Sequence, residues 1–152
     1  MEDYLGAHTA RIADVEALLS ATSPRSTAAA HLGGVAVECR LKDLVATYHD
    51  IAAWGDASRR QKDPYLNCPI PRPGHGLAAS LRLMKALYAR ALADHLFLRH
   101  LGRINHPVGA TAFDFIDLRY SAGQLDPTAI AEWKRSFNYV IGWLDKNGKG
   151  IR

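Results

Sequence analysis

The stretch AAAHLGGVAVECRLKDLV, from Ala28 to Val45, predicts a helix at the centre of the fold. Its apolar residues recur at spacings of three and four, which is the periodicity of one buried helix face. Gly33 and Gly34 each reduce helix propensity by roughly 1 kcal/mol, and they would be tolerated if another helix packs closely there. The apolar positions in and just after the stretch are Leu32, Val35, Ala36, Cys39, Leu44, Val45 and Tyr48.

We expect this helix to run from about Pro24 to Ala53. Ser23 is a good N-cap residue, and Pro24 fits the first helical position because the N–H that it lacks has no partner there. Glu38 and Lys42 are spaced i,i+4 and can form an ion pair on the helix surface.

Three further helical segments follow from the same periodicity. The first is expected from about Asp3 to Ser20 and the second from about Leu77 to Asn105. At about 1.5 Å of rise per residue, the second would be a single helix on the order of 40 Å long, ended by Pro107. The last is expected to begin at Pro127, after Asp126 as N-cap, and to end in NGKG with Asn147 or Gly148 as C-cap.

Two segments lack clear periodicity. Residues 54–76 hold four of the seven prolines together with several basic residues, and they predict an irregular crossover that is either simply solvated or functional. The segment VGATAFDFIDLRYSAG, residues 108–123, predicts a turn or a short helix. The chain therefore predicts one all-α domain over residues 1–152, a four- to five-helix antiparallel bundle with a Pro-rich crossover and a frayed basic tail at 146–152.

Composition narrows the function classes. The chain has 152 residues, 48% of them hydrophobic and 22% charged, which suits one globular domain. No apolar run approaches the roughly 18 residues that a membrane span needs, and the start, MEDYLGAHTAR, does not resemble a secretory signal. Two cysteines make no disulfide framework, so we expect a cytoplasmic protein. The net charge is +4, but half of this excess lies from residue 145 onward, so charge alone does not indicate nucleic-acid binding.

The central stretch resembles the second helix of HEPN domains, which are small α-helical domains of prokaryotic defence and toxin systems. The likeness lies in the run of small residues, the glycine pair, VEC and the following LK. GHGLAASLRLM, residues 74–84, is similar to the start of the family's third helix. DLRYSAG, residues 117–123, is similar to an Arg-Tyr element of many members. The resemblance covers residues 28 to about 144 and implies a HEPN-like bundle.

The resemblance also implies an activity. Many HEPN domains are metal-independent endoribonucleases marked by an arginine, a polar residue and, after four to six intervening positions, a histidine. Arg99, His100 and His106 fit this pattern at its long limit, at the helix end where the family places it. The implied function is an RNase or RNase-toxin component of a defence, toxin–antitoxin or mobile-element system. It would need no cofactor and no metal, would form its site between the subunits of a homodimer, and would bind RNA or nucleotide and an antitoxin partner.

The residue types suit this chemistry. Arg99 and His106 are seven positions apart, about two helical turns or roughly 10 Å along the axis, and would face the same side. Metal-free RNA cleavage needs a base for the 2′-hydroxyl and an acid for the leaving 5′-oxygen, and histidine suits both roles. A guanidinium stabilises the charge on phosphorus oxygens. We therefore expect Arg99 and His106 to be catalytic and these residues to bind or orient RNA: His95, His100, Arg103, Asn105, Arg119 and Tyr120.

Alternatives remain open at this point. His106 could instead be a histidine that stabilises the end of the helix, and Arg99 and Arg103 could be solvated cations. Tyr120 could be a core ring with an exposed hydroxyl. The chain could then be a non-catalytic HEPN-like dimer that binds nucleotide, nucleic acid or a nucleotidyltransferase-like partner, or a purely structural module. Cys68 and His75 could be metal ligands, but two ligands do not make a zinc site. Phosphate-binding loops of the Walker type are absent from the sequence.

Overall fold

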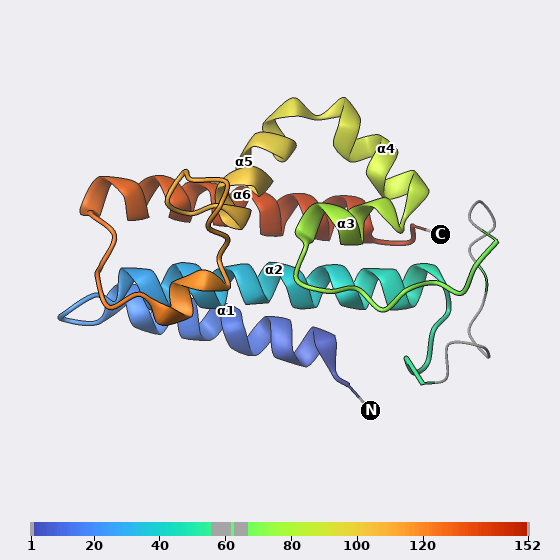
Figure 1. The fold of residues 1–152 in the computed structure, drawn as a ribbon, viewed down its shortest axis with the longest axis horizontal. Coiled ribbons are helices and arrows are strands. Elements are labelled where there is room, and N and C mark those ends of the chain that lie inside the picture. The colour runs from blue at the N-terminus through green and yellow to red at the C-terminus, as the bar shows by residue number, and fades with distance from the viewer. Residues whose placement is uncertain (1, 56–61, 63–66, 152) are drawn as a thin grey trace.

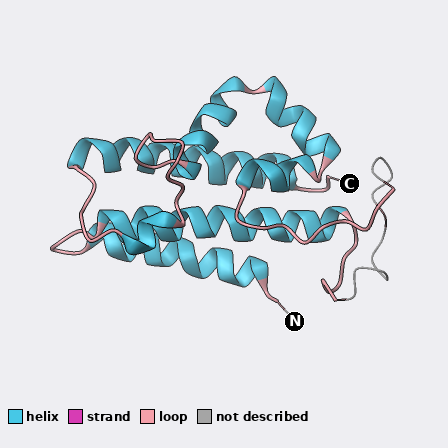
Figure 2. Ribbon diagram, in the orientation of Figure 1, coloured by secondary structure: helices cyan, strands magenta, loops and turns pink. Residues whose placement is uncertain are grey.

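The computed structural model describes residues 2–55, 62 and 67–151. Its regular elements are helical, apart from one isolated β-bridge between Lys62 and Pro69, so the expected all-α class is confirmed for the described residues (Figures 1 and 2). Two basic residues of the predicted crossover, Arg59 and Arg60, lie outside the described residues. The elements are α1 (Tyr4–Ser20), α2 (Ser26–Tyr48), α3 (Leu77–Arg82), α4 (Lys85–Ala93), α5 (His95–Asn105), the 3-10 helix η2 (Asp117–Tyr120) and α6 (Pro127–Gly148).

The helices do not all run antiparallel. Helix α1 lies antiparallel on α2, and α5 lies antiparallel on α6, whereas α2 and α6 run in the same direction (Figure 1). Contacts agree with this direction: a Cβ built at Gly33, early in α2, would touch Trp133, early in α6, and Arg40, later in α2, pairs with Asp145 near the end of α6. The expectation of a wholly antiparallel bundle is therefore wrong for the α2–α6 pair. Parallel neighbours are possible because residues 49–126 lead the chain back to the starting end of the bundle.

Helix α2 is the central element, and its glycine pair explains how closely its neighbours approach. A Cβ at Gly33 would lie 2.4 Å from Cη2 of Trp133 in α6. A Cβ at Gly34 would lie 2.2 Å from Cγ of Phe115, which comes from the segment before η2. Both rings are fully buried, so the glycines allow large apolar side chains to pack directly on the helix backbone. The predicted close approach is confirmed, although a loop residue covers Gly34.

Helix α2 is shorter than the sequence predicts. It begins at Ser26, with Arg25 rather than Ser23 as N-cap and no side-chain capping bond. A tertiary contact compensates for the missing capping bond. Thr27 Oγ1 donates to Gly123 O at 2.6 Å and holds the first turn of α2 against the segment after η2. The helix ends at Tyr48 rather than Ala53, and Asp50 follows with a positive φ of 53°. The predicted ion pair is confirmed, since Lys42 Nζ lies 2.6 Å from Glu38 Oε1.

The single long helix predicted from Leu77 to Asn105 is wrong, because the chain bends twice and forms α3, α4 and α5. In Figure 1, α4 and α5 make an inverted V above α6. At the first bend, the carbonyl of Leu83 accepts a hydrogen bond from His49 Nε2 at 2.6 Å, and the N–H of Ala86 donates to the Tyr48 hydroxyl at 3.4 Å. Residues at the end of α2 therefore satisfy backbone groups that a continuous helix would pair internally.

The second bend is at Asp94, the N-cap of α5. Its carboxylate accepts from the N–H of Phe97 at 3.0 Å and from Trp143 Nε1, on α6, at 3.0 Å. The N–H of Phe97 is the main cause that holds the pKa of Asp94 below its usual value; burial opposes this, and Trp143 and Tyr139 lower the pKa further. Asp94 thus starts α5 and ties it to α6 with one side chain.

This arrangement predicts a pH-dependent contribution to stability. A carboxylate with a lowered pKa in the folded state stabilises the fold above its unfolded pKa, near 4, and loses that contribution as pH falls through the folded pKa. Asp94→Asn should therefore lower the thermal midpoint at pH 7 and reduce the fall of the midpoint between about pH 5 and pH 2. The measurement is thermal denaturation of both proteins across that range. Parallel pH profiles would contradict the role given to Asp94.

The last helix follows the sequence closely. Asp126 is the N-cap of α6, its carboxylate accepts from the N–H of Ala129 at 2.9 Å, and Pro127 occupies the first turn as predicted. The C-cap is Lys149, one residue beyond the predicted Gly148. The predicted frayed tail differs from the structure, because α6 continues through Gly148 and Ile151 is buried against the core. Apolar burial of Ile151 explains why the chain stays folded there.

Residues 67–76 of the Pro-rich segment run along α2 without forming a helix (Figure 1). The segment is fastened at its end by His75, whose Nδ1 lies 2.8 Å from Oε2 of the buried Glu38. Among the described residues, no helix combines the length and apolarity that crossing a bilayer requires.

Candidate functional site

Three of the predicted site residues meet at one pocket at the end of α5. Arg99, Arg103 and His106 line an open hollow of about 290 Å³, together with Gly102, Pro107, Gly109 and Thr111. The helical spacing of α5 places the two arginines on the same face, and the turn that follows α5 contributes Pro107, Gly109 and Thr111 to the lining. The predicted convergence of Arg99, Arg103 and His106 is therefore present within one chain. We call this hollow the α5 pocket.

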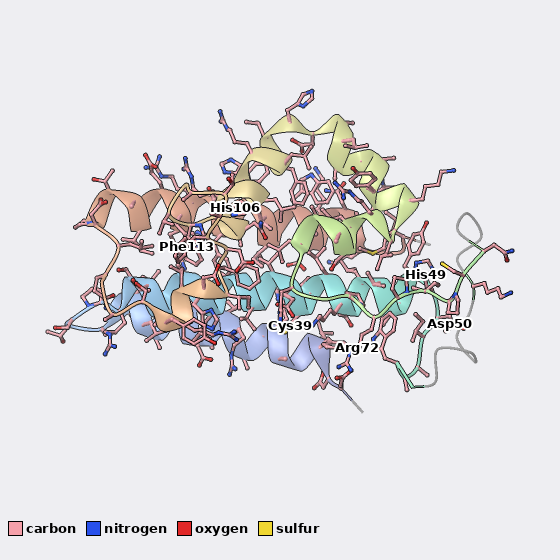
Figure 3. All side chains as sticks on the ribbon, in the orientation of Figure 1. Cys39, His49, Asp50, Arg72, His106 and Phe113 are labelled. Carbon is pink, nitrogen blue, oxygen red and sulfur yellow. The ribbon has the colours of Figure 1, made fainter. Side chains whose placement is uncertain are left out.

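His106 is held in a defined orientation at the C-cap of α5 (Figure 3). Its Nδ1 lies 3.0 Å from the carbonyl oxygen of Phe113, and its Nε2 lies 2.8 Å from Nδ2 of Asn105. Because a carbonyl only accepts, Nδ1 carries the proton, and Nε2 then accepts from the Asn105 amide. With the proton on Nδ1, the lone pair of Nε2 is directed at the Asn105 amide.

The two arginines differ in how available their charge is. Arg99 is exposed and forms no ion pair with any carboxylate in the described ranges. Arg103 lies 3.4 Å from Glu132 on α6, so part of its charge is balanced within the chain. An exposed pair of this kind is worth about 0–1 kcal/mol, so an incoming phosphate can replace Glu132. Arg99 is thus the stronger anion ligand of the two.

Three further predicted residues of α5 do not line the pocket: His95, His100 and Asn105. His100 faces α6, where Nδ1 lies 2.9 Å from Oγ of Ser136 and its ring lies 4.5 Å from that of Tyr139. Burial lowers the pKa of His100, and the nearby guanidiniums of Arg99 and Arg103 lower it further. His95 is exposed at the first position of α5 and does not line the α5 pocket. Neither His100 nor His95 is placed to share proton transfer with His106 inside one chain.

Arg119 and Tyr120 belong to a different place in the fold. They lie on η2, and Arg119 lines a separate pocket of about 360 Å³ beside the first turn of α2. Its guanidinium stands 4.6 Å from the ring centroid of Tyr120, whose side chain is 78% exposed. The structure therefore does not bring Arg119 and Tyr120 to the α5 pocket, and the interpretation of Tyr120 as a core ring is wrong.

Several histidines have structural roles that the sequence does not reveal. His8 of α1 donates from Nδ1 to Ala36 O of α2 at 2.9 Å, and His31 of α2 donates from Nδ1 to Phe115 O at 2.8 Å. With His49 and His106, four of the seven histidines donate to main-chain carbonyls of other segments. These hydrogen bonds link separate segments of the fold. No local pattern marks them, because each partner is distant in sequence or lies in a loop.

The metal hypothesis receives no support. Cys68 is exposed, His75 is engaged by Glu38, and among the described residues no group of three or more His, Cys, Asp or Glu side chains could hold a metal ion. Burial raises the pKa of the Cys39 thiol, with the Glu38 charge adding to the effect, which makes Cys39 a poor nucleophile at neutral pH. The charged and titratable side chains that line the α5 pocket are the guanidiniums of Arg99 and Arg103 and the imidazole of His106.

Comparison with protein-family models, with curated proteins and with solved structures finds no match for this chain. The α5 pocket must therefore be interpreted from its own chemistry. Two guanidiniums beside an imidazole can bind a phosphate and move one proton. The sequence does not predict Gly109 and Thr111 as pocket residues, because they come from a turn whose path depends on the hydrogen bond from His106 to Phe113 O.

Proposed function

We propose that the chain is a metal-independent endoribonuclease that binds an RNA phosphodiester in the α5 pocket. The observation that carries the proposal is the convergence of Arg99, Arg103 and His106 on one open hollow. The proposal agrees with what the HEPN resemblance implies, including a role as RNase toxin of a defence, toxin–antitoxin or mobile-element system with an antitoxin partner.

In this proposal Arg99 holds the scissile phosphate and His106 moves a proton. Its Nδ1–H remains bonded to Phe113 O, so the ring presents Nε2 toward an incoming hydroxyl. A 2′-hydroxyl can take the place of the Asn105 amide, donate to Nε2 and lose its proton as it attacks phosphorus. The product would be a 2′,3′-cyclic phosphate, with Arg99 and Arg103 stabilising the added charge on phosphorus.

One chain supplies one imidazole to the α5 pocket, whereas the reaction needs an acid as well as a base. We therefore include a homodimer in the proposal, with His106 of a second copy protonating the leaving 5′-oxygen. The dimer is part of the proposal and is tested with it, by sedimentation of the protein at several concentrations.

A second function is favoured by one specific observation. Both nitrogens of His106 are engaged, and its bond to Phe113 closes the turn after α5. A histidine with this role can serve the fold alone, and the pocket would then bind RNA, nucleotide or a nucleotidyltransferase-like partner without cleaving it.

The two functions separate in one experiment. The purified protein is incubated with end-labelled single-stranded RNA in EDTA, and the products are analysed for 2′,3′-cyclic phosphate ends. Cleavage that persists in EDTA supports the nuclease, whereas RNA that is retained but uncut supports the binding protein. Absence of both binding and cleavage contradicts the nuclease and the RNA-binding form of the second function.

A further inference from the structure

The pocket beside the first turn of α2, which we call the α2 pocket, is lined by two arginines without compensating carboxylates. Arg25, Arg119 and the imidazole of His31 line it, together with small and uncharged polar side chains. Its described lining residues include no carboxylate, and neither arginine forms an ion pair with a carboxylate in the described ranges. By contrast, Arg40 and Arg72 are paired with Asp43 and Glu2. The charges of Arg25 and Arg119 are therefore available to an anion from outside.

An exposed aromatic ring adjoins these cations. Tyr120 is 78% exposed, and the guanidinium of Arg119 stands 4.6 Å from its ring centroid. A guanidinium on one face of the ring holds the side chain in place and leaves ring surface open. Exposed aromatic rings beside a cationic groove are the means by which proteins bind single strands: bases stack on the ring and phosphates contact the cations.

The segment between the two pockets is held by hydrogen bonds at Phe115 and carries another exposed ring, that of Phe113. Thr111 lines the α5 pocket and Leu118 lines the α2 pocket, and the side chain of Phe113, between them, is 54% exposed. The N–H of Phe115 donates to Asn105 O at 2.9 Å, and its carbonyl accepts from His31. This segment therefore connects the two basic pockets and is hydrogen-bonded at Phe115 to both α5 and α2.

The carboxylates of Asp114 and Asp117, close to the α2 pocket in sequence, accept hydrogen bonds from the main chain. Asp117 Oδ2 accepts from the N–H of Asp114 at 3.0 Å, and Asp114 Oδ1 accepts from the N–H of Ile116 at 2.8 Å. Another pocket, of about 520 Å³, is instead lined by Glu2, Asp3, Asp43 and Asp50, and this acidic lining disfavours a polyanion. The α2 pocket is the better match to a nucleic-acid strand.

We propose that Arg25, Arg119 and Tyr120 form a second RNA subsite, in which one base stacks on Tyr120 and the neighbouring phosphates contact the two arginines. The ligand class, single-stranded RNA, rests on the proposed function, but the site is separate from the α5 pocket. It would hold the strand while a phosphodiester elsewhere along it occupies the Arg99–His106 pocket.

The test uses the full-length protein and a dodecamer of 2′-O-methyl uridylate labelled with fluorescein, which cannot be cleaved because its 2′-oxygens are blocked. Fluorescence anisotropy gives the affinity at several salt concentrations. Tyr120→Ala should weaken binding by roughly 5- to 100-fold, and Tyr120→Phe should restore it, because stacking requires the ring and not the hydroxyl. Arg25→Gln should reduce the slope of log K against log salt by about 0.7. Arg135→Gln removes another exposed arginine, on α6, and is the matched control.

The outcomes separate the subsite from the nuclease. Wild-type affinity in Tyr120→Ala, with an unchanged thermal midpoint, would overturn the subsite, as would equal losses in Tyr120→Ala and Tyr120→Phe. Equal effects of Arg25→Gln and Arg135→Gln on the salt slope would overturn the phosphate contact. Since the oligomer is not cleaved, failure to cut ordinary RNA counts against the proposed nuclease alone.

Discussion

His106→Asn is expected to lower the rate of RNA cleavage by about 10²–10⁴-fold, the usual contribution of a general acid–base group. Asparagine places an amide N–H near the position of Nδ1, so the hydrogen bond to Phe113 O and the closed turn can persist. It cannot accept a proton from a 2′-hydroxyl. The measurement is the initial rate of cleavage of end-labelled RNA in EDTA, with the thermal midpoint determined for the same samples.

Arg99→Gln tests the phosphate ligand of the same site. Removing one charge-stabilising donor usually lowers kcat by about 10²–10³-fold, and Arg99→Lys should recover only part of the rate because an ammonium lacks the planar fork of a guanidinium. Arg135→Gln is the matched control, since Arg135 is exposed on α6 and does not line the α5 pocket. Equal activity of Arg99→Gln and Arg135→Gln would refute the role of Arg99.

Loss of folding in His106→Asn would indicate that His106 serves to close the turn after α5 and would contradict its catalytic role.

Gly34→Ala is expected to destabilise the fold by about 1–3 kcal/mol, which is the usual effect of overpacking a core. The new methyl group would lie 2.2 Å from Cγ of Phe115 and 2.6 Å from its Cβ. Phe115 has little freedom to move, because its ring is fully buried and both its N–H and its carbonyl are hydrogen-bonded, to Asn105 and His31. The clash therefore outweighs the helix propensity that alanine adds, roughly 1 kcal/mol.

The measurement is the free energy of unfolding in urea, with Gly142→Ala as the matched control. Gly142 is also inside a helix, α6, but a Cβ there would meet nothing within 4 Å. Gly142→Ala should therefore stabilise the protein by up to about 1 kcal/mol. If both variants are stabilised alike, Phe115 does not pack on Gly34 as described here.

Much of the helical framework could be predicted from local signals. Asp126 and Pro127 mark the start of α6 because a carboxylate accepts a free N–H and proline needs none. The glycine pair of α2 indicated a close neighbour, because such residues weaken a helix unless packing compensates. The bend at Asp94 was not predicted, because the apolar periodicity on both sides of it favoured one continuous helix.

The site could be predicted only in part. The spacing of Arg99 and Arg103 on one helix is a local property, so their shared face followed from the sequence. The position of Arg119 and Tyr120 did not, because it depends on Thr27 and His31 holding residues 115–123 against α2. The orientation of His106 likewise depends on a carbonyl seven residues later.

By itself, the sequence determined the all-α class, the helix start at Pro127 and the cationic face at the end of α5, since capping and helical periodicity act between residues a few positions apart. Only the tertiary structure decided the bends at Met84 and Asp94, the parallel course of α2 and α6, and the division of the basic residues between two pockets. Each of these depends on side chains such as His49 and Trp143, which satisfy backbone or carboxylate groups from distant parts of the chain. A hydrogen bond of this kind outweighs the small local preference for one more helical turn.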